Sequence, residues 1–251
     1  MIKFFRKIRQ NLIMKNKTGK YLKYAIGEII LVMIGILLAL QVNNWNIART
    51  DKIQETKYLN NIKLDLQKDL GSLTYQINFR KEKYKGTQKL IEQINGEPIT
   101  DVAELNFNVV NTLMEERFTP NNTTYNELSS SGNLNLISND SIKLLLLELQ
   151  EHYKHNTFGI EHEMFEYREY ISKPLFKYTN TDQLTQVFFG NKTVEELNIT
   201  NDNFKALFQS PEYKNGVVIS NIISKDFIPL YETIESKSKK LIALIDKELK
   251  N

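Results

Sequence analysis

The most apolar part of the chain, residues 23–46, reads KYAIGEIILVMIGILLALQVNNWN. Between residues 25 and 42 the only ionisable side chain is Glu28. At a rise of 1.5 Å per residue this stretch forms a helix roughly 27 Å long, which matches the hydrocarbon thickness of a bilayer. A buried helix of a soluble protein seldom runs this far without a polar face. We therefore expect residues 25–42 to form a single transmembrane helix.

Aromatic residues flank this helix on both sides. Tyr21 and Tyr24 precede it and Trp45 follows it, and amphipathic rings of this kind gather at the two interfaces of a membrane. A cleaved signal peptide is the alternative, because it also carries an apolar stretch near the N-terminus. No small-residue cleavage site follows the stretch, where the chain reads QVNNW. We expect an uncleaved signal anchor, with the three aromatic residues as interface anchors.

The charges around the span predict its orientation. Residues 1–23 carry eight basic side chains and no acidic one, whereas the basic residues just beyond the span are matched by acidic ones. The positive-inside rule then keeps residues 1–24 in the cytoplasm and sends residues 43–251 across a bacterial inner membrane into the periplasm. The basic segment suits anionic lipid headgroups. The rest of the chain is mildly acidic, so we expect no nucleic-acid partner.

Glu28 lies about 5 Å inside the cytoplasmic end of the span. At that depth a carboxylate reaches the headgroups or takes a proton at less cost than at the bilayer centre, which is the simplest interpretation. Glu28, Gly35 and Ala39 also share one helical face. Gly35 and Ala39 have the small-xxx-small spacing that lets two helices approach closely. The alternative is therefore a self-associating helix in which Glu28 forms a hydrogen bond across the pair.

The composition favours long helices and excludes several kinds of chemistry. Among 251 residues there are only 10 glycines and 5 prolines, which disfavours turn-rich β folds. The sequence contains no cysteine, which excludes disulfides, thiolate catalysis and cysteine-ligated metal sites. Charged residues make up 25% of the chain and apolar residues 41%, as in a folded protein rather than a disordered one.

The pattern beyond the span predicts an all-α fold, an elongated helical bundle with a long, stalk-like first helix. Residues 47–95 form that helix, and no proline or glycine before Gly71 separates it from the span. Gly96 and Pro98 end it. Its apolar residues recur at heptad spacing, as in a coiled coil or a bundle. They form two rows, Leu59, Leu66 and Leu73, and Leu70, Ile77, Tyr84 and Ile91, with Ile62 and Ile94 in between.

Local start and stop signals predict the remaining helices. We expect a helix from Asp101 to Phe118, and a short helix that begins with a capping box at Thr124 and ends at Gly132. Further along the chain we expect a long helix over residues 140–172 that Pro174 ends or bends, followed by short helices and loops over residues 175–209. The last expected helix begins at Ser210, continues to Glu248 and is kinked at Pro229.

Two stretches resemble a known family. They are KYLKYAIGEIILVMIGILLALQVNNWN near the N-terminus and TTYNELSSSGNLNLISND from residue 123. The chain resembles a family of uncharacterised single-span membrane proteins of Gram-negative bacteria, a domain of unknown function. The resemblance extends over the whole chain and implies an inner-membrane protein with a helical part outside the cytoplasm. It implies no activity, ligand or catalytic residue.

Three histidines lie on the helix predicted over residues 140–172. Glu148, His152 and His155 have the spacing i, i+4 and i+7, so they can reach one divalent ion, for which imidazole and carboxylate are suitable ligands. His162 lies roughly 10 Å further along the helix and cannot join them. The sequence has neither a zincin motif nor the di-iron Glu-x-x-His spacing. We therefore favour a solvated polar face and assign no metal and no cofactor.

No motif in the sequence meets the requirements of an active site, and we do not expect an enzyme. The leading hypothesis is a membrane-anchored structural or interaction module whose helical domain, residues 43–251, binds a protein partner or itself. The alternative is a ligand-sensing helical bundle outside the cytoplasm. Because only residues 1–24 remain inside, such a sensor needs a partner subunit to report inward.

Overall fold

The computed structural model describes residues 18–250, and within this range every regular element is helical. The all-α class expected from the sequence is confirmed. The chain divides into two compact units, Met1–Thr56 and Lys57–Asn251. Most of the predicted basic segment, residues 1–17, lies outside the described residues.

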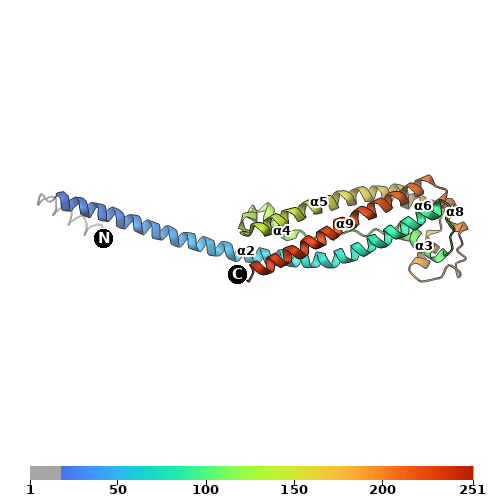
Figure 1. Ribbon diagram of the computed structural model, residues 1–251, viewed down its shortest axis with the longest axis horizontal. Helices are drawn as coiled ribbons and strands as arrows, with labels where there is room; N and C mark the ends of the chain where they lie inside the picture. Colours follow the sequence, from blue (N-terminus) through green and yellow to red (C-terminus); the bar gives the residue numbers. More distant parts are fainter. Residues whose placement is uncertain (1–17, 251) are drawn as a thin grey trace. The chain divides into compact units, whose positions relative to one another are not determined.

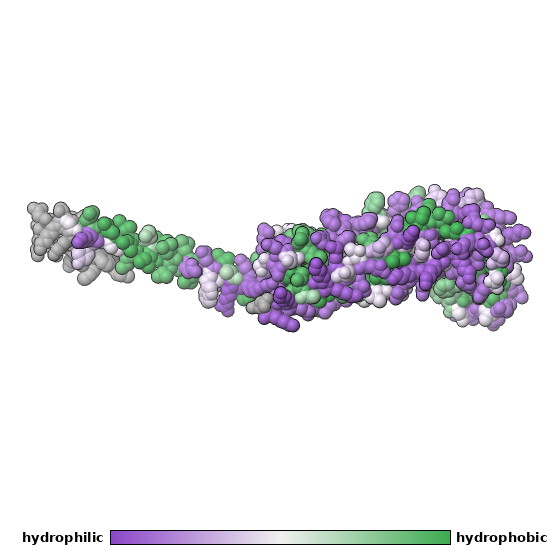
Figure 2. Space-filling model, in the orientation of Figure 1, coloured by the Kyte–Doolittle hydropathy of each residue, from purple (hydrophilic) through white to green (hydrophobic). Residues whose placement is uncertain are grey.

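The first unit contains the apolar stretch, which is part of helix α2 (Thr18–Ile94). Every large apolar side chain from Ile26 to Val42 is between 45% and 67% exposed, and Figure 2 shows hydrophobic surface along this part of α2. The mean hydropathy of its most apolar 18-residue window is 2.4, and none of that window is buried. Among the described residues α2 is the one helix long and apolar enough to cross a membrane, a property that signal sequences share.

The second unit is an elongated helical bundle (Figure 1). The remainder of α2 lies alongside α5 (Asp140–Glu166) and α9 (Pro211–Glu248). The short helices α3 (Val102–Asn111), α6 (Lys173–Tyr178) and α8 (Asp202–Phe208) gather at one end of the bundle. The other short elements are α4 (Thr123–Ser130), α7 (Thr181–Phe188), the 3₁₀ turn η1 (Asn133–Leu136) and the π-helical turn η2 (Tyr167–Ser172).

Several predicted helix boundaries are confirmed. α2 ends just before Gly96, which has a φ of 111°, a conformation that glycine adopts without a steric penalty. Asn139 and Ser210 cap α5 and α9, because each side-chain oxygen accepts hydrogen bonds from backbone N–H groups of the first turn. Pro229 lies inside α9 and does not end it.

Two predictions for residues 101–130 are wrong in detail. The helix that begins after Asp101 ends at Asn111 rather than Phe118, because the chain beyond it finds hydrogen-bond partners on the side chains of α2 and α5. α4 forms as expected, but its capping box does not. The hydroxyl of Thr124 donates to Asp65 Oδ2 at 2.5 Å instead of capping its own helix.

A π-helical turn interrupts the long helix predicted over residues 140–172. This turn, η2, lies directly before the first turn of α6, which contains Pro174. Proline has no N–H to donate and its ring crowds the preceding turn, so the wider turn lets the helical path continue to Tyr178. Pro174 therefore does not end the helical run. Single π turns of this kind are frequent at functional sites.

One side of α2 forms a regular buried row in the second unit, which we call the α2 seam. Its members follow one another at intervals of three and four residues, and none is more than 4% exposed. The seam consists of Leu59, Ile62, Leu66, Asp69, Leu73, Gln76, Arg80, Lys83, Thr87 and Leu90. Of the second apolar row predicted from the sequence, only Ile77 is buried, while Leu70, Tyr84 and Ile91 lie partly exposed beside the seam.

The α2 seam connects two hydrophobic clusters. The first contains Leu59 to Ile77 of α2 together with apolar residues of α5 and α9. The second contains Leu90 together with residues of α3, η2 and the beginning of α9. Between the two clusters the seam is polar, and Arg80, Lys83 and Thr87 replace the apolar residues that the heptad pattern leads one to expect.

Candidate functional site

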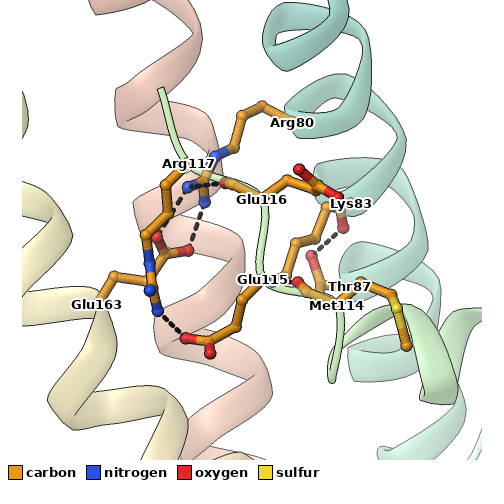
Figure 3. A network of polar contacts seen from close by, with 8 residues as sticks. All are labelled: Arg80, Lys83, Thr87, Met114, Glu115, Glu116, Arg117 and Glu163. Carbon is orange, nitrogen blue, oxygen red and sulfur yellow. Dashed lines mark hydrogen bonds and ion pairs between the residues drawn. The ribbon is translucent and has the colours of Figure 1, made fainter. Parts of the chain in front are cut away.

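A buried ion pair occupies the polar part of the α2 seam. Arg80 is 1% exposed, and its two terminal nitrogens donate to both carboxylate oxygens of Glu163 of α5, with Nη2 2.7 Å from Oε2 (Figure 3). This bidentate geometry is the strongest that arginine and a carboxylate form. Burial alone would raise the pKa of Glu163, but the hydrogen bonds and charge of Arg80 hold that pKa below its usual value. The pair is therefore ionised at neutral pH.

Lys83 follows Arg80 on the same side of α2 and is 3% exposed. Its ammonium donates to the carbonyl oxygen of Met114 at 3.0 Å. Burial lowers the pKa of Lys83 to about 8, although Glu163 favours the charged form. A cavity of about 20 Å³ lies beside Lys83 and is also lined by Glu166 and Tyr167. This volume has room for one water molecule and is too small for an organic ligand.

Arg80, Lys83 and Glu163 form what we call the polar layer. This layer contacts the irregular 112–122 segment between α3 and α4. Buried backbone groups outside a helix need hydrogen-bond partners elsewhere. The carbonyl of Glu116 accepts from Arg80 Nη2 at 3.2 Å, and that of Phe118 accepts from Asn156 Nδ2 of α5 at 3.0 Å. Together with the bond from Lys83, these contacts give the segment fixed donors along its length. Figure 3 shows the contact of Arg80 with Glu116.

Two aspartates of α2 bind the far end of the 112–122 segment and the first turn of α4. Asp69 accepts from the backbone N–H of Asn121 at 2.9 Å, and Asp65 accepts from the N–H of Thr124 at 3.2 Å. Burial raises the pKa of Asp69 to about 6, against the effect of its hydrogen bonds from Asn121 and Tyr153. Cationic and amide side chains thus face carbonyl groups, and carboxylates face N–H groups. Side chains of α2 and α5 therefore bind the backbone of the 112–122 segment and of Thr124.

Sequence reasoning missed these buried charges because it followed the apolar residues. After Leu73 it moved to the row of Ile77 and Tyr84, whereas the structure keeps the original spacing through Gln76 and Arg80. The signal was present in the sequence, since these polar residues continue the three-and-four interval without interruption. Polar residues at regular core positions of a long helix indicate a polar partner.

A partly open groove lies between α5 and α9. Its volume is about 200 Å³. Phe158, which is 66% exposed, stands at its edge, and Figure 2 shows hydrophobic surface on the face that α5 and α9 form. Gly159 leaves room for the ring of Phe227, whose Cζ would lie 2.8 Å from a Cβ at this position. The groove is lined by His155, Phe158, Gly159 and His162 of α5 and by Ile223, Asp226, Phe227 and Leu230 of α9.

Phe227 lines this groove and also contacts the polar layer. The ring of Phe227 lies 4.6 Å from the guanidinium carbon of Arg80, close enough for a cation–π contact. The groove and the ion pair between Arg80 and Glu163 thus share Phe227 as a neighbour.

The three residues considered as metal ligands, Glu148, His152 and His155, are not placed around a common metal position. Within residues 18–250, no three histidine, aspartate or glutamate side chains are placed to hold one metal ion. Glu148 Oε2 accepts a hydrogen bond from Lys237 Nζ of α9 at 2.5 Å, which lowers the pKa of Glu148. His152 is half-buried beside this pair, and burial lowers its pKa. His155 is exposed and lines the α5–α9 groove.

The residues assigned to the membrane lie in the first unit. Gly35 and Ala39 are exposed, and a Cβ at Gly35 would meet no other atom. Glu28 is half-buried and takes part in an interaction within the chain. Tyr24 is 55% and Trp45 64% exposed, while the side chain of Tyr21 lies outside the described ones. Their roles in helix packing and at the membrane interfaces stay predictions.

Comparison with known proteins gives a family but no activity. A family of unknown function, DUF6090, matches residues 28–204. The chain belongs to this family. The DUF6090 match is shorter than the whole-chain resemblance expected from the sequence; it includes the polar layer of α2 and α5 and ends within α8. No curated protein and no solved structure matches the chain.

Proposed function

We propose that this DUF6090 protein is a membrane-anchored helical module that binds a protein partner. Residues 25–42 cross the inner membrane once, residues 1–24 remain in the cytoplasm against anionic lipid, and residues 43–251 lie in the periplasm. The observation that carries this proposal is the exposed apolar part of α2, where none of the most apolar window is buried. Apolar surface of this extent is unfavourable in water, and a bilayer removes it from water.

The features of the second unit favour binding over catalysis. Its buried charges are engaged with one another and with the 112–122 segment. One accessible apolar feature of this unit is the α5–α9 groove, where Phe158 is exposed beside a hollow of about 200 Å³. An exposed aromatic residue next to a groove is typical of the centre of a protein interface.

The anchor is tested by membrane extraction of the full chain with a reporter enzyme at its C-terminus. We expect the chain to stay in membranes washed with alkaline carbonate and the reporter to be active only outside the cytoplasm. The double variant Leu31→Lys/Ile36→Lys places two charges inside the span, where each costs about 3 kcal/mol, and should release the chain. Leu64→Lys is the control, since Leu64 is 54% exposed on α2 in the second unit.

Two results would overturn the anchor. One is release of the unmodified chain by carbonate, and the other is reporter activity confined to the cytoplasm.

A further inference from the structure

The outer face of α5 carries a second row of side chains, separate from its buried face. Its members recur at intervals of three and four residues over six turns, and every one is exposed. This spacing keeps the row on one side of the helix and is the pattern by which two helices pack along a common line. The row, which we call the outer row of α5, consists of Leu144, Leu147, Glu151, His155, Phe158, His162 and Phe165.

We propose that a second copy of this chain packs against the outer row of α5, with the two α5 helices antiparallel and Phe158 of each copy seated in the α5–α9 groove of the other. The inference rests on the proposed function, because it names the partner of the binding module. A two-fold interface must be complementary to itself. A protruding ring directly beside a groove on the same face meets this requirement, since each copy supplies one ring and one groove.

The dimensions of the two parts agree. The groove of about 200 Å³ has room for one phenyl ring, and its apolar lining from Phe227, Ile223 and Leu230 suits such a ring. His155 and Asp226 lie at the groove as well, so a ring that enters it replaces water on apolar walls while polar groups remain beside them. A buried aromatic anchor surrounded by polar residues is the usual arrangement of an interface centre.

The charges beside the outer row favour the antiparallel orientation. Lys154 and Glu161 lie on the same side of α5, four residues before and three residues after Phe158, and both are exposed. When a two-fold axis passes near Phe158, Lys154 of each copy lies next to Glu161 of the other. In a parallel pair the two residues stand about 10 Å apart along the helices. Within one chain Lys154 donates to Glu151 at 2.7 Å, and an ammonium group has two further donors.

The association is measured by sedimentation of the full chain in detergent. All variants carry Gly35→Leu, which removes the small-residue face of the membrane helix as a second source of dimers. We expect a dimer, and Phe158→Ala should raise its dissociation constant at least tenfold. Phe176→Ala is the matched control, because Phe176 of α6 is 60% exposed, and should leave the constant unchanged.

A charge reversal tests the orientation. Lys154→Glu and Glu161→Lys should each weaken the dimer about threefold or more, and the two changes together should restore it. All the changed side chains are exposed, and circular dichroism checks that the helices remain. A monomeric chain, equal effects of the two phenylalanine substitutions, or a double reversal weaker than either single one would overturn the inference. None of these results bears on whether carbonate releases the chain, so the two proposals fail separately.

Discussion

The two halves of the α2 seam have the same spacing and the same burial but different chemistry. From Leu59 to Leu73 the seam is apolar except at Asp69 and belongs to a hydrophobic cluster with α5 and α9. From Gln76 to Thr87 it is polar and bonds to Glu163 and to the 112–122 segment. The partner explains the difference: a helix presents an apolar stripe, whereas an irregular segment presents carbonyl and N–H groups that need partners.

The two halves also contribute differently to the fold. Apolar packing stabilises many alternative registers of two helices almost equally, because it depends on area rather than direction. A bidentate ion pair forms only when Arg80 stands opposite Glu163. We infer that the apolar half supplies most of the stability and the polar half sets the register of α2 against α5.

The largest effect is expected from breaking the ion pair on one side. Arg80→Met leaves Glu163 buried without its partner and removes a donor from the carbonyl of Glu116. The free energy of unfolding should fall by about 3 to 5 kcal/mol, measured by urea titration of the full chain in detergent with circular dichroism. The double variant Arg80→Met/Glu163→Leu should lose less, since no buried charge remains. A single variant within 1 kcal/mol of the native chain would contradict the role of the pair.

A cavity in the apolar half should have a somewhat smaller effect. Leu73 is fully buried in the first hydrophobic cluster, and Leu73→Ala removes contacts that the surroundings replace only in part. We expect a loss of about 3 kcal/mol in the same titration. Leu64→Ala on the exposed side of α2 is the control and should change the stability by less than about 0.5 kcal/mol. Equal losses at the two positions would show that the α2 seam is not the core.

A third variant tests the contact of α9 with η2 beyond the polar layer. A Cβ at Gly216 would lie 2.4 Å from the carbonyl oxygen of Tyr170, so Gly216→Ala must displace backbone and should cost about 1 to 3 kcal/mol. Gly71→Ala is the matched control, because a Cβ at Gly71 meets nothing within 4 Å. That change should stabilise α2 by up to about 1 kcal/mol. Opposite signs are the expected result, and a stable Gly216→Ala chain would refute the close approach.

The smallest effect concerns the charge inside the apolar half. Asp69 has a folded pKa of about 6 because of burial, above its value in an unfolded chain. The protonated form therefore favours folding: its contribution is complete below about pH 4 and is lost as the pH rises through 6. Asp69→Asn keeps the hydrogen-bond acceptor for Asn121 and removes this dependence.

The measurement is the difference in unfolding free energy between Asp69→Asn and the native chain at pH 4.5 and pH 7. We expect it to shift by about 1 to 2 kcal/mol in favour of the variant at the higher pH, less than the full pKa difference allows because water screens part of the charge. A difference that stays constant over this range would mean that Asp69 is not buried as a carboxylate.

The long helices could be predicted from the sequence, because their signals are local. The apolar stretch, the asparagine before α5 and the serine before α9 each determine structure within a few residues. The end of α3 could not be predicted in this way. The sequence pattern of residues 112–118 predicts a helix. In the structure these residues are not helical, and Arg80, Lys83 and Asn156 donate hydrogen bonds to their backbone carbonyl groups.

The candidate sites were predictable to a smaller extent for the same reason. His155 was considered as a metal ligand together with Glu148 and His152 of the same helix, but the surroundings of His155 come from α9, some 70 residues later in the chain. Arg80 is a core residue only because Glu163 meets it from α5. A single sequence shows which side of a helix is apolar, but it does not show which residue faces a charge on that side.

The most direct test of a membrane-anchored interaction module is photo-crosslinking of the full chain in intact membranes. A photoreactive phenylalanine analogue replaces Phe158 in one sample and Phe176 in another, since both rings are exposed to a similar extent. We predict a crosslinked protein product at position 158, in the carbonate-resistant membrane fraction, and none at position 176. Absence of a product at 158, or equal products at both positions, would contradict binding through the α5–α9 face.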